Sequence, residues 1–206
     1  MKPIKLLLVD DHAVVRMGLA SLLGTRREFT VVGEASDGET AIRKTLSLKP
    51  DVVVMDLVMP DMDGVETTRQ IHTKMPETNI LILTSYGSAN GISHALEVGA
   101  IGAILKNISF PDMVNAIISA SMGKRVLSPE IEQLLTNEPS IPPLSSRQEE
   151  VLNSVTQGLS NEQIAALLNI SLPVVKEHIR ALFTKLGASS RAEAVAIALR
   201  KHLLKI

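Results

Sequence analysis

Short runs of apolar, largely β-branched residues alternate with helical patterns over the first 122 residues of the chain. Five such runs predict strands: Ile4–Val9, Thr30–Gly33, Val52–Met55, Ile80–Leu83 and Ile101–Leu105. Five segments with apolar residues at every third or fourth position predict helices: His12–Leu23, Gly38–Leu48, Val65–Lys74, Ala89–Val98 and Pro111–Ser121. Strands that alternate with helices of this length form parallel sheets through right-handed crossovers, so we expect an α/β domain over residues 1–122.

The pattern changes after residue 122, and residues 123–143 are typical of a linker. Three prolines in the segment Asn137–Pro143 remove backbone donors and fix φ, so neither a helix nor a central strand can continue through it. A short helix is predicted before these prolines, over Ser128–Leu135, with Pro129 in its first turn.

Residues 144–206 predict a small all-α domain of four helices. Ser145, Ser160 and Ser190 are each followed three residues later by Gln or Glu, which is the pattern of a capping box at the start of a helix. Ser171, followed by Pro173, marks the start of one more helix, which lies between those that begin at Ser160 and Ser190.

The helix predicted over Leu172–Leu186 has two different faces. Lys176, Glu177 and Arg180 lie side by side on one of them. The other carries an apolar stripe at spacings of four, three and four residues: Val175, Ile179, Leu182 and Leu186. A short helix, a tight turn and a second helix with outward basic residues fit a helix-turn-helix, whose second helix enters the major groove of DNA. An ordinary solvated charged face would give the same periodicity.

Composition excludes several classes of function. The 206 residues include no cysteine, so the chain has no disulfide framework, no thiolate zinc site and no cysteine nucleophile. Its four aromatic residues are too few for a surface on which single-stranded nucleic acid stacks. No apolar run reaches the roughly 18 residues of a membrane span, and the N-terminus does not resemble a signal peptide. We therefore expect a cytoplasmic protein that does not bind a membrane.

The net charge of −1 is the sum of two opposite excesses. Residues 1–122 carry 11 basic and 14 acidic side chains, a net of −3, whereas residues 144–206 carry eight basic and five acidic side chains, a net of +3. An acidic first part and a basic second part predict a different partner for each.

Polar side chains follow four of the five predicted strands. Asp10 and Asp11 follow the first strand, Asp56 the third, Thr84 the fourth and Lys106 the fifth. The carboxyl ends of parallel strands meet at one edge of the sheet, where ligands bind in folds of this class. Three carboxylates, a hydroxyl and an amine suit a Mg²⁺ ion and a phosphoryl group, because Mg²⁺ prefers oxygen ligands and offsets the repulsion between the acids. Each acid taken singly would also serve as an ordinary helix cap.

The motifs around these residues resemble the receiver domain of two-component response regulators over about residues 4–121. The matching segments are Leu8–His12, Met55–Gly64, Leu83–Ser85 and Ile104–Lys106. The resemblance implies a flavodoxin-like (βα)5 domain that takes a phosphoryl group from a sensor histidine kinase.

The same resemblance assigns a role to each polar residue at the strand ends. It implies that Asp56 is the phosphoacceptor and that Thr84 and Lys106 bind the oxygens of the phosphoryl group. A Mg²⁺ ion is then held by Asp10, Asp11, Asp56 and the backbone carbonyl of Val58.

The chain departs from the receiver pattern at Ala103. Many receivers have Tyr or Phe three residues before the lysine, and that ring turns inward when the threonine shifts toward the phosphoryl group. Tyr86 lies two residues after Thr84, which suggests the hypothesis that it shields the phosphoryl group or takes over part of the switch. A solvent-facing loop tyrosine is the alternative.

Residues 144–203 resemble the LuxR-type DNA-binding domain. The matching segments are Leu144–Leu152, Gly158–Ala165, Ile170–Ser171, Val175–His178 and Lys185–Leu186. Together with the receiver, this makes the chain similar to the NarL/FixJ subfamily of response regulators.

The second resemblance implies that Lys176, Glu177 and Arg180 read base edges in double-stranded DNA. Lys or Arg donates to guanine, and Glu accepts from the amino group of cytosine. His178 is expected at the interface or facing a phosphate. Val174 stands where the family often has Thr, so a hydroxyl that can contact phosphate is absent there.

Taken together, these features predict a transcription factor controlled by phosphorylation rather than an enzyme. A kinase phosphorylates Asp56, the chain forms a homodimer, and two recognition helices read half-sites about one helical turn apart, with RNA polymerase as a possible further partner. Two alternatives stay open. In one, Ala103 leaves the receiver inert and the protein binds DNA or another protein regardless of phosphorylation. In the other, the C-terminal domain binds RNA, which the scarcity of rings disfavours.

Overall fold

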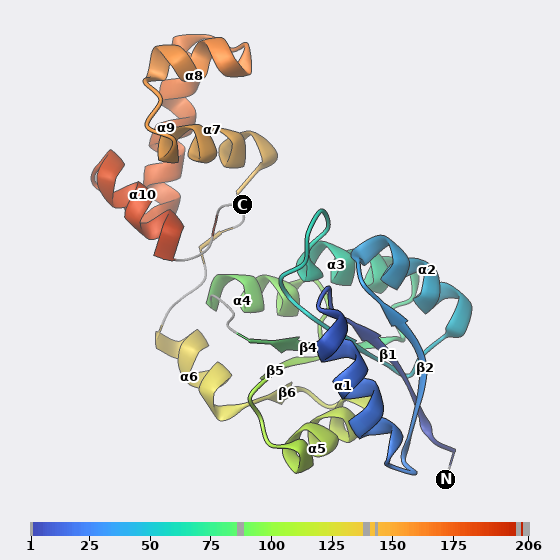
Figure 1. Ribbon diagram of the computed structural model, residues 1–206. Helices are drawn as coiled ribbons and strands as arrows, with labels where there is room; N and C mark the ends of the chain where they lie inside the picture. The colour runs from blue at the N-terminus through green and yellow to red at the C-terminus, as the bar shows by residue number, and fades with distance from the viewer. Residues whose placement is uncertain (1, 86–88, 138–140, 143, 201–202, 204–206) are drawn as a thin grey trace. The chain divides into compact units, whose positions relative to one another are not determined.

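The computed structural model describes residues 2–85, 89–137, 141–142, 144–200 and 203. The chain forms two compact units, Met1–Pro139 and Ser140–Ile206, and each is described by itself (Figure 1).

The first unit is built on a parallel sheet of six strands in the order β2-β1-β3-β4-β5-β6. The strands are β1 (Ile4–Val9), β2 (Phe29–Ala35), β3 (Val52–Met55), β4 (Asn79–Thr84), β5 (Gly102–Leu105) and β6 (Val126–Leu127). The predicted α/β class and parallel sheet are confirmed. The order of the first five strands is that of a flavodoxin-like sheet, in which the strand order reverses beside β1.

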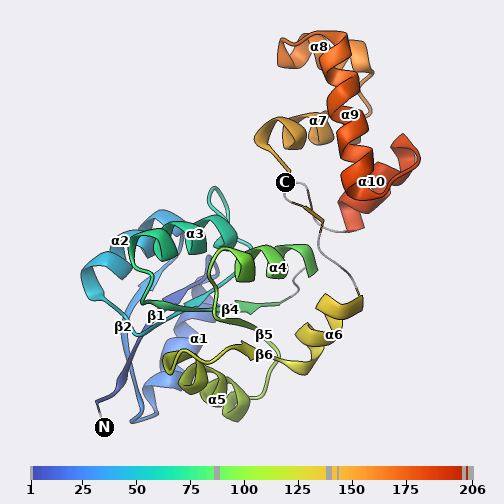
Figure 2. The same ribbon diagram turned by 180° about the vertical axis from the view of Figure 1, so that it is seen from behind.

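Helices cover both faces of this sheet, as the two opposite views show (Figures 1 and 2). They are α1 (Ala13–Gly24), α2 (Gly38–Leu48), α3 (Gly64–Lys74), α4 (Ala89–Glu97) and α5 (Phe110–Ser121). One apolar cluster joins the sheet to α1 and α5, and a second joins it to α2, α3 and α4. The predicted helix bounds hold to within one residue at each end, because the apolar periodicity of each helix faces one of these two clusters.

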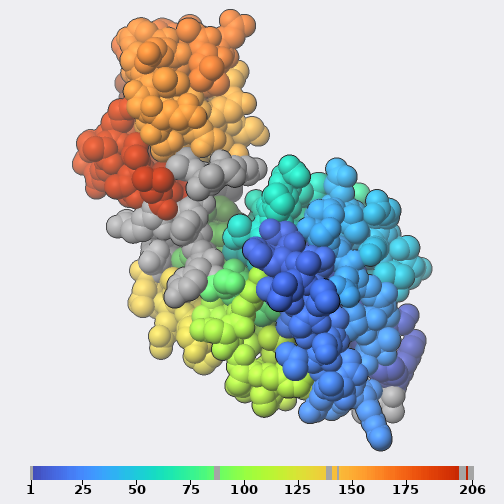
Figure 3. Space-filling model, in the orientation of Figure 1, coloured from blue at the N-terminus to red at the C-terminus, as the bar shows by residue number. Residues whose placement is uncertain are grey.

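Helix α1 buries only its inner side, and its outer side lies on the surface of the first unit (dark blue in Figure 3). Leu19 and Leu23 pack into the sheet, whereas Val14 and Met17 on the outer side are 83% and 67% exposed. The apolar pattern of this helix is therefore wider than the stripe that the core uses.

The sixth strand and the helix that follows it were not predicted as part of the sheet domain. Val126 and Leu127 pair with Gly102 and Ala103 of β5, and helix α6 (Pro129–Asn137) then packs against α4 and β5. Ile131 of α6 is fully buried in the same cluster as α4. Residues 126–137, which the sequence pattern assigned to the linker, thus belong to the first compact unit. A strand of two residues is too short to produce a periodic signal.

The described residues of the second unit form four helices, as predicted. They are α7 (Ser146–Thr156), α8 (Asn161–Leu168), α9 (Leu172–Leu186) and α10 (Arg191–Arg200). Their core contains Val151, Ile164, Val175, Leu182 and Ala198.

Side-chain caps begin two of these helices as the sequence predicted. The reciprocal capping boxes of Ser145 with Gln148 and of Ser160 with Gln163 are both present. The expected box at Ser190 is only half formed, because the carboxylate of Glu193 accepts from the backbone and hydroxyl of Ser189 instead.

Among the described residues, no helix combines the length and the apolar character needed to cross a membrane.

Two glycines in the first unit give opposite predictions for the same change. A Cβ on Gly102 would lie 2.0 Å from the carbonyl oxygen of Val126, so Gly102→Ala must push β6 away from β5. We expect it to lower the free energy of unfolding by about 1–3 kcal/mol. Gly18 of α1 has nothing within 4 Å of such a Cβ, and Gly18→Ala should raise stability by about 0.5–1 kcal/mol. Urea unfolding of both variants tests this, and equal effects would contradict the close approach of β6.

Candidate functional site

The carboxyl ends of β1, β3, β4 and β5 bring the predicted polar residues together. Asp56 follows β3, Thr84 ends β4 and Lys106 follows β5, and all three line one cavity of about 330 Å³. Asp11 and Val58 line the same cavity, so the structure places both beside Asp56. Asp10 is 2% exposed and contacts Lys106, which also lines this cavity.

Backbone pairing fixes the position of Asp56. Its N–H donates to the carbonyl of Val9 at 2.8 Å, and its Oδ1 accepts from the N–H of Leu57 at 2.8 Å. The start of α3 closes over it, since a Cβ on Gly64 would lie 2.2 Å from the carbonyl oxygen of Asp56. The carboxylate is therefore held at the sheet edge with little freedom to move.

Lys106 bridges two of the three carboxylates. Its Nζ lies 2.8 Å from Oδ2 of Asp56 and 2.5 Å from Oδ2 of Asp10. Its N–H donates to the carbonyl of Thr84 at 2.8 Å, which ties the end of β5 to the end of β4. The ammonium thus offsets the repulsion between acids that would otherwise face each other in a buried site.

Burial and this bridge shift the pKa values of both partners. Burial raises the pKa of Asp56 above its ordinary value, and the hydrogen bond from Lys106 limits the rise. Burial alone would lower the pKa of Lys106, but its hydrogen bonds to Asp10 and Asp56 outweigh burial and raise it. Two carboxylates therefore stabilise the charged form of Lys106. Asp56 is stabilised by one cation only, and the like negative charge of Asp10 disfavours its ionisation.

Two residues that the sequence interpretation did not assign to this site also contact its acids. His12 places Nδ1 2.8 Å from a carboxylate oxygen of Asp11 and donates its backbone N–H to Asp10. Arg16 of α1 donates to the backbone carbonyl of Asp10 at 2.6 Å. Both lie within six residues of Asp10 in the sequence, at and just after the start of α1. This closeness was the signal from which their contact with the acids could have been predicted.

The acidic residues fit a divalent cation. One ligand atom from each of Asp10, Asp11, His12 and Asp56 can be chosen so that all lie within 4.8 Å of one another. Carboxylate oxygens of this number and spacing are what Mg²⁺ uses, with water completing the octahedron.

The structure describes two of the three residues that the sequence linked to the switch. Thr84 is 1% exposed and Ala103 is fully buried. Ala103 lies in β5, where it pairs with Ile82 of β4 and Leu127 of β6. Tyr86 lies outside the described residues, so the hypothesis about it stays untested.

Helix α9 of the second unit presents the predicted reading face. Lys176, Glu177 and Arg180 are exposed, whereas Val175 and Leu182 are buried in the core. His178 is partly buried and Val174 is 36% exposed. Ser171 begins the helix with extended backbone, and Asn169, with φ of 52°, makes the tight turn after α8.

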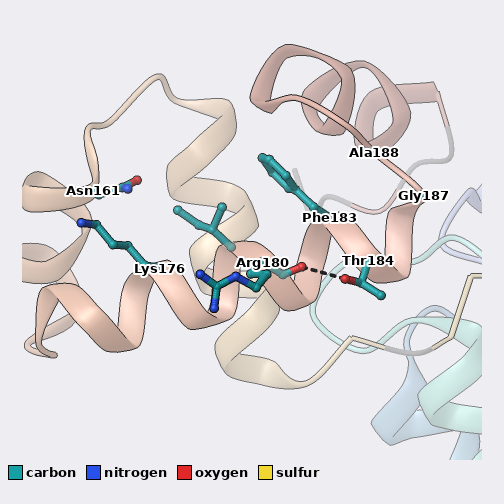
Figure 4. A pocket seen from close by; sticks show the side chains of 8 residues that line it. Asn161, Lys176, Arg180, Phe183, Thr184, Gly187 and Ala188 are labelled. Carbon is teal, nitrogen blue, oxygen red and sulfur yellow. Dashed lines mark hydrogen bonds between the residues drawn. The ribbon is translucent and has the colours of Figure 1, made fainter.

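A shallow hollow adjoins this face. It is lined by Lys176, Arg180 and Thr184 of α9 together with Asn161, the first residue of α8 (Figure 4). Lys176 extends toward Asn161, and the hydroxyl of Thr184 donates to the carbonyl of Arg180 at 3.1 Å. Ile179 and Phe183 also line the hollow, so basic and neutral polar groups surround an apolar floor in one shallow concave surface.

The two units match two family models in the same order. The response regulator receiver domain matches residues 6–118, and the luxR family of bacterial regulatory proteins matches residues 142–198. The chain therefore belongs to the response regulators that join a receiver domain to a LuxR-type DNA-binding domain, and the NarL/FixJ-type organisation expected from the sequence is confirmed.

Several relatives match nearly the full length of the chain. The response regulator protein VraR of Staphylococcus aureus is 38% identical over 207 residues, which span 98% of this chain and 99% of VraR. The crystal structure of ChrA, a response regulator of a heme-sensing two-component system, is 38% identical with a TM-score of 0.59 and covers 99% of this chain and 100% of ChrA. RcsB of Salmonella enterica serovar Typhimurium, bound to a promoter in the presence of the phosphomimetic BeF₃⁻, is 25% identical with a TM-score of 0.68 over 95% of this chain and 98% of RcsB.

The raised pKa of Asp56 predicts a stability that depends on pH. A carboxyl whose pKa is higher in the folded state costs stability once it is ionised, so Asp56→Asn should raise the thermal midpoint at pH 7. The gain should shrink as pH falls through the raised pKa and vanish below about 4, the ordinary value for Asp. Lys106 keeps Asp10 as a partner in this variant.

Asp61→Asn is the matched control, because Asp61 is exposed and its left-handed backbone, with φ of 61°, suits Asn. Thermal unfolding of both variants between pH 3 and 8 measures the difference. Destabilisation of Asp56→Asn at pH 7 would show that the attraction to Lys106 outweighs burial.

Proposed function

We propose that the first unit accepts a phosphoryl group on Asp56 from a sensor histidine kinase, and that this controls dimerisation and DNA binding by the second unit. The observation that carries the proposal is the position of Lys106, whose ammonium bridges Asp10 and Asp56 in the cavity that Thr84 also lines. A fixed cation and a hydroxyl beside a buried carboxylate are what the transfer of a phosphoryl group to that carboxylate requires.

The reaction moves phosphorus from nitrogen to oxygen. A carboxylate oxygen of Asp56 attacks the phosphorus of the kinase phosphohistidine, the P–N bond breaks, and the imidazole takes a proton from water. Lys106 then exchanges its bond to Asp56 for one to a phosphoryl oxygen, and the Thr84 hydroxyl donates to another. In this proposal the protein's own chemistry consists of accepting the phosphoryl group and slowly hydrolysing the resulting aspartyl phosphate.

A Mg²⁺ ion belongs to this proposal. Asp10, Asp11, Asp56 and the carbonyl of Val58 would hold it, and when bound it supplies positive charge that offsets the charge of the phosphoryl group. The closeness of Asp10, Asp11 and Asp56 supports this assignment.

The second unit is proposed to read double-stranded DNA through α9. In this proposal the exposed Lys176, Glu177 and Arg180 face the bases, with His178 near the DNA backbone. The relative RcsB, whose structure contains a promoter, supports DNA binding. A homodimer would place two such helices on an inverted repeat. The proposed partners are the sensor histidine kinase, double-stranded DNA and RNA polymerase, and the proposed location of the protein is the cytoplasm.

One selection experiment tests this function against its two alternatives. Wild type, with and without beryllofluoride and Mg²⁺, and Asp56→Ala are used to select from a random double-stranded DNA library with RNA competitor present. We expect an inverted repeat to be enriched only by wild type with the phosphoryl mimic. Enrichment that ignores the mimic would favour an inert receiver, and preference for the competitor would favour RNA binding.

The reading face gives a second prediction. Arg180→Ala and Lys176→Ala should each weaken binding to the selected site by about 1–3 kcal/mol, because a base or phosphate contact is lost while the core stays intact. Arg147→Ala is the matched control, since Arg147 lies on α7 and pairs with Glu150 at 2.6 Å. Fluorescence anisotropy on labelled DNA measures the three affinities, and a loss as large in the control would contradict the assignment of α9.

A further inference from the structure

The segment of residues 126–137, here called the β6–α6 arm, covers the edge of the sheet that carries Lys106. Val126 donates its N–H to the carbonyl of Ile101, and Ser128 donates to the carbonyl of Ala103, both at 3.2 Å. Without these bonds β5 would be an edge strand with an open hydrogen-bonding side. Both ribbon views place β6 at the sheet edge and α6 beside α4 (Figures 1 and 2).

The arm rests on the two elements that flank the phosphoryl-binding residues. Ile131 is fully buried in a cluster that includes Ala103, and Leu105 packs against the same cluster immediately before Lys106. The cluster also holds Ile92 of α4, the helix that begins five residues after Thr84. The arm therefore supports β5 and α4 from outside the site.

Two small residues allow this close approach. Gly102 leaves space for the carbonyl of Val126, and Ala103 is fully buried opposite Leu127. A side chain at position 102 would have to displace Val126 of the arm. The arm therefore occupies space that a larger side chain at position 102 of β5 would need.

The arm is attached by few interactions. Its strand has two residues, Ile131 is the only fully buried residue of α6, and Leu134 and Leu135 are partly buried. Ser128 is 5% exposed, yet its hydroxyl has no hydrogen-bond partner among the described residues. Release of the arm would let water satisfy that hydroxyl, so docking is opposed by an unmet hydrogen bond.

We propose that Ile131 is a positioning residue for Lys106: the docked β6–α6 arm holds the end of β5 where the ammonium meets the phosphoryl site. By linkage, a group bound at Asp56 that uses Lys106 must in turn favour the docked arm by the same factor. The second unit begins at residue 140, shortly after the arm ends. Binding at Asp56 would therefore stabilise the segment of chain that leads into the second unit. This inference rests on the proposed phosphoryl site.

The experiment uses the full-length protein with beryllofluoride and Mg²⁺ as the probe. Hydrogen exchange of peptides covering residues 123–137 is measured with and without the probe, and the affinity for beryllofluoride is measured by ¹⁹F NMR. In wild type we expect the probe to slow exchange in the arm. Ile131→Ala should speed exchange there and lower the affinity about fivefold or more, and Ile131→Val should give a smaller change in the same direction.

Ile42→Ala is the matched control, because it removes the same atoms from the same cluster on α2, a helix that packs against α3, β1 and β2 rather than against β5. It should leave the affinity for beryllofluoride unchanged. The inference is overturned if Ile131→Ala frees the arm with wild-type affinity, if both variants lose affinity equally, or if the probe speeds exchange in the wild-type arm. Failure of wild type to bind the probe at all would instead refute the proposed phosphoryl site.

Discussion

The first unit depends on one electrostatic arrangement, the ammonium of Lys106 held between the carboxylates of Asp10 and Asp56. Acids buried on neighbouring strands repel each other, and a fixed cation makes their closeness tolerable without filling the cavity beside them. The lysine comes from β5, two strands away from β3, so its reach depends on the register of the whole sheet. Pairing of Asp56 with Val9 and of Lys106 with Thr84 sets that register at the site itself.

The two units use charge in opposite ways. In the first, Asp10 and Asp56 are buried, where charges interact more strongly than in water. The energy of each carboxylate therefore depends strongly on neighbouring charges and on any charged group that binds beside it. In the second, Lys176 and Arg180 stand exposed on a helix whose other side is anchored by Val175 and Leu182. Exposed basic side chains on a rigid helix suit the phosphates of a nucleic acid, which attract cations irrespective of sequence. The first unit carries 13 basic and 17 acidic side chains, a net of −4, and the second carries eight and five, a net of +3, which accords with these two uses.

Ala103 has a different meaning in the folded protein from the one the sequence suggested. As a departure from the receiver pattern it indicated a missing ring and a weakened switch. In the structure it is a fully buried residue that pairs with Leu127 of β6 and lies in the same apolar cluster as Ile131 of α6. A small side chain there accompanies a covered edge, so the absence of the ring and the presence of the β6–α6 arm belong together.

The sequence by itself determined the class of each domain and most helix and strand bounds to within one or two residues, because periodicity is a local signal. It also predicted Asp10, Asp11, Asp56, Thr84 and Lys106 as site residues, from their positions after strands and from the family resemblance, and the structure brings these residues together. Capping at Ser145 and Ser160 was equally local. Only the tertiary structure decided that residues 126–137 join the first unit, that Lys106 bridges two particular acids, and that His12 and Arg16 contact them. Those outcomes depend on which segments meet across the sheet, and a two-residue strand or a single long-range contact leaves no periodic trace in the chain.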